Sequence, residues 1–295
     1  MELPQRELIL NPWLPKAGLC MIHAKTGIGK THISLNVAYA VACGGDFLGW
    51  EAEKPRGVLF IDGEMPAMIL QERLKNILKM NRHAEFQEEF KIITPDLQEI
   101  GIPDIATLEG QSIINQHITD GVDLIILDNL SCLVKSGKEN ESESWEPIQT
   151  WLLNLRRQGK SVLLIHHAGK SGSQRGASKR LDVLDSVIYL ERPEGYTQDE
   201  GARFNVVFEK NRGFCGDDAK SFEASLVCDH QGNLIWKTNS LKETTYQQVV
   251  RLLNAGMIQE QIAKELSRNP STISRHANKA YREGLIKIPA RANDN

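Results

Sequence analysis

The stretch that decides the fold runs from Leu19 to Thr31 and reads LCMIHAKTGIGKT. Its first part, Leu19–His23, is short and apolar, as a strand buried on both faces of a parallel sheet should be. Gly27 and Gly29 then allow the backbone to curl, so that successive N–H groups point at one anion, at the positive end of the helix that follows. The spacing predicts a phosphate-binding loop between a strand and a helix.

This loop matches the Walker A motif of nucleotide-binding proteins, except that alanine replaces the first glycine. Lys30 is placed to reach the β- and γ-phosphates of a nucleotide, and the Thr31 hydroxyl is placed to hold Mg²⁺. The alternative is a glycine-rich turn with an incidental lysine. The predicted nucleotide-binding residues are Ala24, Lys25, Thr26, Gly27, Ile28, Gly29, Lys30 and Thr31.

Short apolar runs alternate with helix-length amphipathic segments through the first two thirds of the chain. This alternation predicts a parallel sheet with right-handed crossovers and helices on both faces. The expected strands are Leu19–His23, Val58–Asp62, Lys91–Thr94, Asp123–Asp128 and Ser161–His166, and the expected helices are Thr31–Cys43, Ala67–Met80, Ile105–Ile118 and Glu143–Gln158. An antiparallel meander is expected from Asp185–Leu190, Arg203–Glu209, Ser221–Asp229 and Asn233–Lys237. The predicted fold class is α/β, with a mostly parallel core and an antiparallel β extension.

Two carboxylates at strand ends are candidates for the chemistry. Asp128 ends an apolar strand in the manner of a Walker B motif, where it would orient water on Mg²⁺. Because Asn129 rather than glutamate follows it, the catalytic base must come from elsewhere. Glu64 lies just past the strand Val58–Asp62, at the edge where ligands bind in this architecture, and could orient the attacking water. The alternatives are a buried strand that ends in aspartate at a turn, and solvated loop acids.

These segments resemble the RecA-like ATPases, the superfamily of recombinases and ring-shaped replicative helicases. The segment FIDGE at 60–64 is similar to that family's FIDAE-type segment, and LLIHH at 163–167 is similar to its sensor strand. The resemblance covers roughly residues 10–237. It implies that Glu64 is the catalytic base, that His167 contacts the γ-phosphate, and that ATP and Mg²⁺ are the cofactors. Since adjacent strand residues point to opposite faces, His166 and His167 are not expected to bind one metal ion.

A basic pair, Lys210 and Arg212, follows the strand-like segment Arg203–Glu209. Residues i and i+2 of a strand share one face, so the two side chains should project together. By the same resemblance, Arg212 would be an arginine finger that enters the ATP site of the adjacent subunit, with Lys210 as its companion. This implies a homo-oligomer, most simply a hexameric ring. The alternative is a sheet edge with solvated basic residues.

The segment 168–182 is rich in glycine and serine and carries a cluster of basic residues. In RecA-like proteins a loop at this place contacts nucleic acid, which implies single-stranded DNA in the ring channel, held by Lys170, Arg175, Lys179 and Arg180. The alternatives are a surface loop, or one that meets the phosphates of ATP. The HHAGK and RGAS segments resemble the signature of the RepA-type hexameric helicases of plasmids and other mobile elements.

Charge is unevenly distributed along the 295 residues. The net charge of the chain is -3, and residues 1–240 carry -7 while residues 241–295 carry +4. This asymmetry predicts an ATPase domain over 1–240 and a small basic domain over 241–295. With 41% hydrophobic and 25% charged residues, the composition is that of a globular protein. No segment resembles a membrane span or a signal peptide, so we expect a cytoplasmic protein without a membrane partner.

The basic domain reads as three helices: Tyr246–Leu253, Ile258–Leu266 and a third capped by Asn269 with proline in its first turn. It resembles the helix-turn-helix of many transcription regulators, which implies binding of duplex DNA. A protein-docking bundle is the alternative. The residues expected to reach base edges and phosphates are Ser271, Thr272, Ser274, Arg275, Asn278 and Lys279.

The function expected from these features is an ATP-dependent DNA helicase or translocase, acting as a ring in the replication of a plasmid or mobile element. The alternative is a DNA-binding regulator whose ATPase controls its oligomeric state without unwinding. The basic segment 168–182 favours the motor, and the helix-turn-helix taken alone would suit the regulator.

Overall fold

The computed structural model describes residues 6–81, 89–136, 142–168, 182–241 and 245–286. The predicted DNA-contacting residues Lys170, Arg175, Lys179 and Arg180 lie outside these ranges. The chain divides into two compact units, Met1–Ser240 and Leu241–Asn295.

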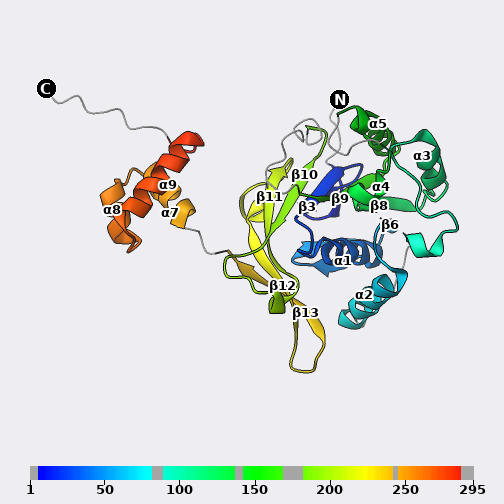
Figure 1. The fold of residues 1–295 in the computed structure, drawn as a ribbon, viewed down its shortest axis with the longest axis horizontal. Helices are drawn as coiled ribbons and strands as arrows, with labels where there is room; N and C mark the ends of the chain where they lie inside the picture. The colour runs from blue at the N-terminus through cyan, green and yellow to red at the C-terminus, as the bar shows by residue number, and fades with distance from the viewer. Residues whose placement is uncertain (1–5, 82–88, 137–141, 169–181, 242–244, 287–295) are drawn as a thin grey trace. The chain divides into compact units, whose positions relative to one another are not determined.

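The first unit is built on a nine-stranded sheet with the order β13-β12-β11-β10-β3-β9-β8-β6-β7 (Figure 1). From β10 to β7 in this order, all neighbouring strands pair in parallel. This part of the sheet confirms the predicted α/β fold class. Its strands are β3 (Leu19–Ala24), β6 (Gly57–Asp62), β7 (Phe90–Ile93), β8 (Val122–Asp128), β9 (Ser161–His167) and β10 (Ser186–Glu191).

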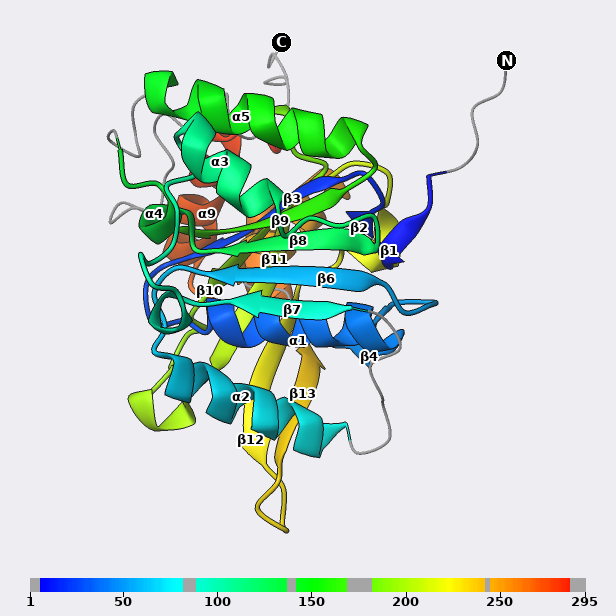
Figure 2. The same cartoon turned by 90° about the vertical axis from the view of Figure 1, so that its right-hand side faces the viewer.

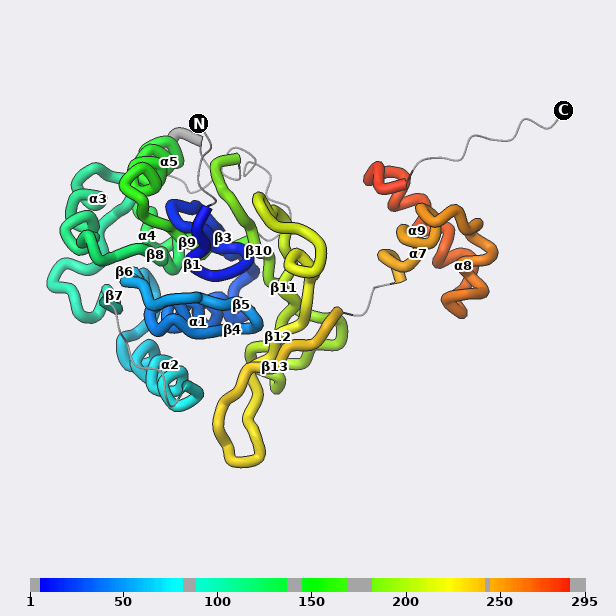
Figure 3. Tube along the Cα trace, turned by 180° about the vertical axis from the view of Figure 1, so that it is seen from behind, coloured from blue at the N-terminus to red at the C-terminus, as the bar shows by residue number. Residues whose placement is uncertain are grey.

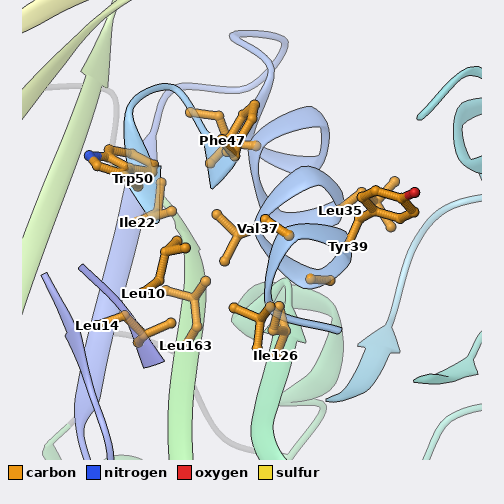
Figure 4. Close-up of a cluster of buried hydrophobic side chains, with 14 of the residues drawn as sticks. Leu10, Leu14, Ile22, Leu35, Val37, Tyr39, Phe47, Trp50, Ile126 and Leu163 are labelled. Carbon is orange, nitrogen blue, oxygen red and sulfur yellow. The ribbon is translucent and has the colours of Figure 1, made fainter. Parts of the chain in front are cut away.

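Helices cover both faces of the parallel part, as Figure 2 shows. Helices α1 (Lys30–Cys43) and α2 (Ala67–Met80) lie on one face, and α3 (Leu108–Asn115) and α5 (Ser142–Arg157) lie on the other. Consecutive strand residues alternate between two apolar cores: Ile22, Ile126 and Leu163 pack toward α1, while their neighbours Met21, Ile125 and Leu164 belong to the second core. Figure 4 shows the α1 side of this arrangement. This two-sided burial explains why the strands read as continuous apolar runs.

The antiparallel extension begins at β10, as the sequence predicts. Strand β10 pairs in parallel with β3 and antiparallel with β11, so it belongs to both parts of the sheet. The expectation that Asp185–Leu190 belongs to an antiparallel meander is confirmed by the pairing with β11, and the parallel pairing with β3 is an addition that the sequence did not predict. The strands β11 (Arg203–Asn211), β12 (Phe222–Cys228) and β13 (Leu234–Ser240) complete this edge of the sheet (Figure 3). The 3-10 turn η2 (Gln198–Glu200) lies between β10 and β11, and η3 (Gly216–Ala219) lies between β11 and β12.

Two small hairpins were not expected from the sequence. They are β1 (Leu8–Leu10) with β2 (Leu14–Pro15), and β4 (Asp46–Phe47) with β5 (Trp50–Glu51). Their strands are too short to give a periodic signal, and tertiary packing of Trp13 against Trp50 holds them in place, with ring centroids 5.2 Å apart. They close the α1 side of the sheet.

Helix α3 is shorter than the expected Ile105–Ile118. It begins after Thr107, whose hydroxyl accepts a hydrogen bond from the Gly110 N–H. A Cβ at Gly110 would lie 2.0 Å from the Asp104 carbonyl oxygen, so the turn before the helix packs directly on its first residues. A 3-10 turn η1 (Pro95–Leu97) and a short helix α4 (Leu130–Leu133) complete the connections on this edge.

In the second unit, the described residues 245–286 form three helices: α7 (Thr245–Asn254), α8 (Gln259–Glu265) and α9 (Pro270–Arg282). Val249, Ile262 and Ile273 bring one fully buried side chain from each helix into a common core. The Asn269 side chain accepts a hydrogen bond from the Ser271 N–H and so caps α9. Among the described residues, no helix is long and apolar enough to cross a membrane.

Candidate functional site

The glycine-containing loop connects two elements that fix its position. Strand β3 is buried along its whole length and lies in the middle of the sheet, and α1 begins directly after the loop. Gly27 and Gly29 have φ angles of 78° and 123°, which favour glycine over residues with a side chain. Helix α1 has no side-chain cap and no acidic residue in its first turn. Its N-terminus is therefore available to an anion.

Lys30 is the buried cation of this loop. Its side chain is 5% exposed, and its Nζ donates hydrogen bonds to the carbonyl oxygens of Ala24 and Lys25, each at 3.2 Å. Burial lowers the pKa of the ammonium, and the negative charges of Asp128 and Glu64 oppose that shift. Among the described contacts of Lys30, no hydrogen bond to a carboxylate occurs, so the charge is available to a phosphate oxygen.

Two carboxylates lie side by side at the carboxyl ends of neighbouring strands. Asp62 of β6 and Asp128 of β8 are in register, and both are 2% exposed. The Ser34 hydroxyl donates a hydrogen bond of 2.7 Å to Asp128, and the Thr31 side chain hydrogen-bonds to the same carboxylate. Burial raises the pKa of Asp128, and burial together with the neighbouring negative charge raises that of Asp62 to about 7.

Glu64 lies in reach of three polar side chains. The Asn129 Nδ2 donates to its Oε2 at 2.6 Å, the His167 Nε2 lies 3.7 Å from the same oxygen, and the Cys132 thiol lies at 3.8 Å. The carboxylate is thus oriented by an amide from the residue after Asp128. This arrangement suits a group that positions a water molecule or accepts a proton.

His167 links the two halves of the site. Its Nδ1 lies 2.9 Å from the Lys30 Nζ and 3.3 Å from the Thr26 hydroxyl. Burial and the Lys30 charge lower the pKa of the imidazole, which keeps it neutral at neutral pH. His166, the preceding residue of β9, is 8% exposed and does not line the cavity. No cluster of three or more metal-ligating side chains occurs in the part of the chain that the structure describes.

The phosphate-binding loop, the strand-end carboxylates and His167 meet at one cavity of about 530 Å³, which is large enough for a nucleotide. Its lining includes the loop from Thr26 to Thr31, the carboxylates of Asp62, Glu64 and Asp128, and His167. Ala24 and Lys25 contribute through their carbonyl oxygens, which accept from Lys30. The structure therefore brings together, from four strand ends, every residue that the sequence assigns to phosphate binding and to the attacking water.

The residues present fit a nucleotide with Mg²⁺. Thr31 and Asp128 offer a hydroxyl and a carboxylate in mutual contact, and Mg²⁺ prefers oxygen ligands of this kind. Lys30 and the uncapped start of α1 offer positive charge beside them. The pKa values of Asp62 and Asp128 are raised, and a bound cation would lower them because it favours the charged form of each carboxylate.

Several residues of the site were missed from the sequence. Asp62, Asn129, Arg73, Arg192 and Tyr196 all line the cavity. Asp62 and Asn129 flank residues that the motifs single out, and Arg192 follows directly after β10, so the rule that ligands bind at the carboxyl ends of parallel strands could have identified them. Arg73 lies one helical turn after Ile69 on α2, and no motif marks it.

The basic pair at the end of β11 lies elsewhere. The side chains of Lys210 and Arg212 both donate to the carbonyl oxygen of Asp182, at 3.4 Å and 3.0 Å. They project together, as the strand periodicity predicts, and neither lines the cavity of its own chain. Their role in a neighbouring subunit stays a prediction.

In the second unit, the predicted DNA-contacting residues all belong to α9. Ser271, Arg275 and Asn278 are exposed and recur on one face of the helix, whereas Thr272 and Ser274 are partly covered. Lys279 is exposed but its Nζ lies over the Tyr246 ring, 4.7 Å from the centroid, and 3.7 Å from Glu283. Its ammonium therefore has partners within the unit.

Comparisons with known proteins agree with this picture. A family model described as an AAA domain matches residues 1–173, more than half of the chain. Among solved structures, a KaiC-like protein from the hyperthermophilic archaeon Pyrococcus horikoshii is similar in fold, with a TM-score of 0.54 and 15% sequence identity, over 80% of this chain and 96% of that one. A comparison with curated proteins gives no match.

Proposed function

Because this chain belongs to the AAA domain family, a family of P-loop ATPases, we propose that it hydrolyses ATP to unwind DNA or to move along it. We further propose that it acts as a ring in the replication of a plasmid or mobile element. The observation that carries the proposal is the single cavity at which the loop lysine, the strand-end carboxylates and His167 converge. These are the groups that phosphoryl transfer requires: a phosphate cradle, a metal-holding pair and a residue that orients water.

The chain's own residues divide the chemistry among them. The backbone of the loop and Lys30 hold the phosphates, and Thr31 with Asp128 would hold Mg²⁺, which neutralises charge on the phosphate oxygens when bound. Glu64, oriented by Asn129, positions the water that attacks the γ-phosphate. His167 contacts both Lys30 and Glu64 and is placed to respond to the γ-phosphate.

Oligomer formation would complete the site. Arg212 and Lys210 are absent from the cavity of their own chain, and they lie together at the end of β11. An arginine from a neighbouring subunit would stabilise charge on the transferred phosphoryl group, an effect of about 10³–10⁵ in rate. The assembly that the RepA-type signature favours is a hexameric ring. In this ring, single-stranded DNA would be contacted by the basic residues Lys170, Arg175, Lys179 and Arg180.

The second unit is the proposed duplex-binding part. Its net charge of +4 contrasts with the acidic first unit, and α9 presents Ser271, Arg275 and Asn278 on one face. A helix with these side chains fits the major groove, where arginine and asparagine pair with guanine and adenine.

Strand displacement on a forked DNA substrate tests the proposal. We expect the wild-type protein with ATP and Mg²⁺ to release the displaced strand, and Lys30→Ala to release none because the phosphates lose their buried cation. Ser34→Ala is a useful second variant, since it removes only one hydrogen bond to Asp128 and should retain part of the activity.

One observation favours the alternative function, a regulator whose ATPase controls its oligomeric state. The three-helix unit has a core of its own, so duplex binding by this unit would not require contacts with the first unit. ATP hydrolysis by the wild-type protein without strand release or directed movement, together with an oligomeric state that changes with nucleotide, would support the regulator and contradict the motor.

A further inference from the structure

A second cavity lies on the α1 side of the sheet, and among the described residues it shares no lining residue with the nucleotide cavity. Its volume is about 300 Å³, which is within the range of small-molecule sites. It is lined by residues of α1, by the hairpin of β4 and β5, by the end of α2 and by β13. The cavity therefore brings together side chains from four separate parts of the first unit.

Asn36 of α1 brings a buried amide to this cavity. It is 5% exposed, and its Nδ2 donates a hydrogen bond of 2.7 Å to the His32 carbonyl oxygen. Because a carbonyl oxygen only accepts, the amide nitrogen must face His32 and the Oδ1 must face away from it. The described contacts give this Oδ1 no donor. A buried acceptor without a donor is costly, so the amide calls for a partner that the described chain does not supply.

Two further oxygen acceptors line the same cavity. The Asn81 Nδ2 donates to the Ile77 carbonyl oxygen at 2.9 Å, so this amide also presents its Oδ1. Asp46 is exposed, and its carboxylate has no ion-pair partner among the described contacts. The lining residues that the structure describes include no lysine, arginine or histidine. The amides and the carboxylate thus offer acceptors, and the formal charge of this lining is negative.

The carboxyl end of α2 adds to the negative character of the cavity. Helix α2 ends at Met80, and both Met80 and Asn81 line the cavity. The last carbonyl groups of a helix carry partial negative charge and favour a nearby cation. Lys79, in the same turn, is exposed and does not line the cavity. The partial charge at this end of α2 is therefore available to a cation inside the cavity.

Aromatic rings form another part of the wall. Phe47 and Trp236 pack edge to face with ring centroids 5.4 Å apart, and Tyr39 of α1 lines the same cavity. Figure 4 shows Phe47 and Tyr39 beside α1. The face of an aromatic ring attracts a cation, most strongly in tryptophan. Rings combined with acceptors suit a ligand that carries a donor-rich cationic group on an apolar chain.

We propose that this second cavity binds a small organic cation, with a guanidinium or primary ammonium group on a short apolar chain. Asn36 and Asn81 accept hydrogen bonds from the cationic group, and Asp46 balances its charge. The ring of Trp236 covers the chain beside the charge. The inference goes beyond the proposed ATP hydrolysis and does not rest on it, because it concerns a different cavity.

The test compares a guanidinium with a neutral molecule of the same shape. The dissociation constants of n-butylguanidinium and n-butylurea are measured calorimetrically on the full chain, with and without ADP and Mg²⁺. We expect n-butylguanidinium to bind at least about tenfold more tightly, because the urea lacks the charge and two of the donor hydrogens. ADP should change this affinity less than about twofold, since the two cavities share no described lining residue.

Two variants remove acceptors from the cavity. Asn36→Leu keeps the side-chain size and removes the buried amide oxygen, so n-butylguanidinium should bind at least about tenfold more weakly. Asp46→Asn removes the exposed charge and should weaken binding about two- to fivefold. Asn76→Leu and Asp218→Asn alter residues outside the described lining and should leave the affinity unchanged. Thermal unfolding midpoints establish that each variant is folded.

Equal affinity for n-butylguanidinium and n-butylurea would overturn the proposal, because the cavity would then select only an apolar chain. Absence of binding at n-butylguanidinium concentrations up to about 10 mM would overturn it too. Displacement of the cation by ADP, together with unchanged affinity in Asn36→Leu, would place the cation in the nucleotide cavity and contradict the second site. Failure of ADP itself to bind would contradict the proposed ATPase, and the comparison of Asn36→Leu with wild type would still decide the second site.

Discussion

Asp62 is one of two buried carboxylates that end neighbouring strands of the site. It is 2% exposed, it lies in register with Asp128, and its Oδ2 accepts hydrogen bonds from the N–H groups of Glu64 and Met65. Burial and the negative charge of Asp128 raise its pKa to about 7. Without a metal ion, and at a pH between about 4 and 7, Asp62 therefore retains a proton that an unfolded chain would release.

The raised pKa of Asp62 predicts a pH-dependent stability difference in nucleotide-free and Mg²⁺-free protein. Between pH 4 and 7 the folded protein binds a proton at Asp62 that the unfolded chain does not, so this group lowers the free energy of unfolding as pH rises. Asp62→Asn removes this dependence and keeps an acceptor oxygen. The free energy of unfolding of Asp62→Asn minus that of wild type should rise between pH 4 and 7, by up to about 4 kcal/mol, and level off above pH 7.

Urea unfolding followed by circular dichroism at several pH values measures this difference. Asp46→Asn, an exposed carboxylate at the start of β4, is the matched control and should run parallel to wild type. A constant difference between Asp62→Asn and wild type across the range would show that Asp62 is charged in the folded protein and would contradict the account.

At the residue scale, the sequence predicts single positions within motifs but not their partners. Lys30, Asp128 and Glu64 follow from the loop pattern and from strand ends. The amide of Asn129 that orients Glu64, and the contact of Arg192 with the Gly27 carbonyl, join residues 65 and 165 positions apart. Such contacts depend on strand order and register, which a single sequence does not specify.

At the scale of elements, Asp185 connects the start of β10 with β3 and the N-terminal segment. Its carboxylate, 5% exposed, accepts hydrogen bonds from the Leu19 N–H at 2.9 Å and from both terminal nitrogens of Arg6. Its carbonyl oxygen accepts from the Arg212 N–H at 2.9 Å. The parallel pairing of β10 with β3 thus begins at a buried polar anchor.

Removal of the Asp185 carboxylate should lower the stability of the fold. Asp185→Ala leaves the Leu19 N–H buried without its acceptor and Arg6 without its charge partner, so the free energy of unfolding should fall by about 2–4 kcal/mol. Asp218→Ala, at an exposed position without such contacts in the described structure, should change it by less than about 0.5 kcal/mol. Chemical unfolding gives both values, and equal small effects would show that the anchor does not hold β10.

The sequence predicts an element well where burial produces a long apolar run. It predicts an element poorly where the position of a strand depends on its pairing partner. The parallel core strands and helices α1, α2 and α5 agree with the expected ranges to within one or two residues. Strand β10 carries the same Val, Ile and Leu whether its neighbour is parallel or antiparallel, so its pairing with β3 is invisible in the sequence. The hairpins β1–β2 and β4–β5 depend on packing of Trp13 and Trp50, which lie far from any periodic pattern.

At the scale of the whole molecule, the proposed ring requires that one subunit completes the site of the next. If Arg212 acts on the neighbouring cavity, a subunit with Arg212→Ala and one with Glu64→Gln each lose activity for different reasons. Mixing the two should restore ATP hydrolysis, because some interfaces then combine an intact Glu64 with an intact Arg212. A steady-state ATPase assay across mixing ratios measures this, and a mixture no more active than the separate variants at every ratio would place Arg212 outside the reaction.

Displacement of streptavidin from the end of a biotinylated single strand tests the proposal that ATP hydrolysis in this cavity drives movement along DNA. We expect the wild-type protein with ATP and Mg²⁺ to free streptavidin faster than spontaneous dissociation. Lys30→Ala, or wild type with a non-hydrolysable analogue, should not do so. Wild-type protein that hydrolyses ATP in the presence of the strand and leaves streptavidin in place, from either end, would contradict the claim.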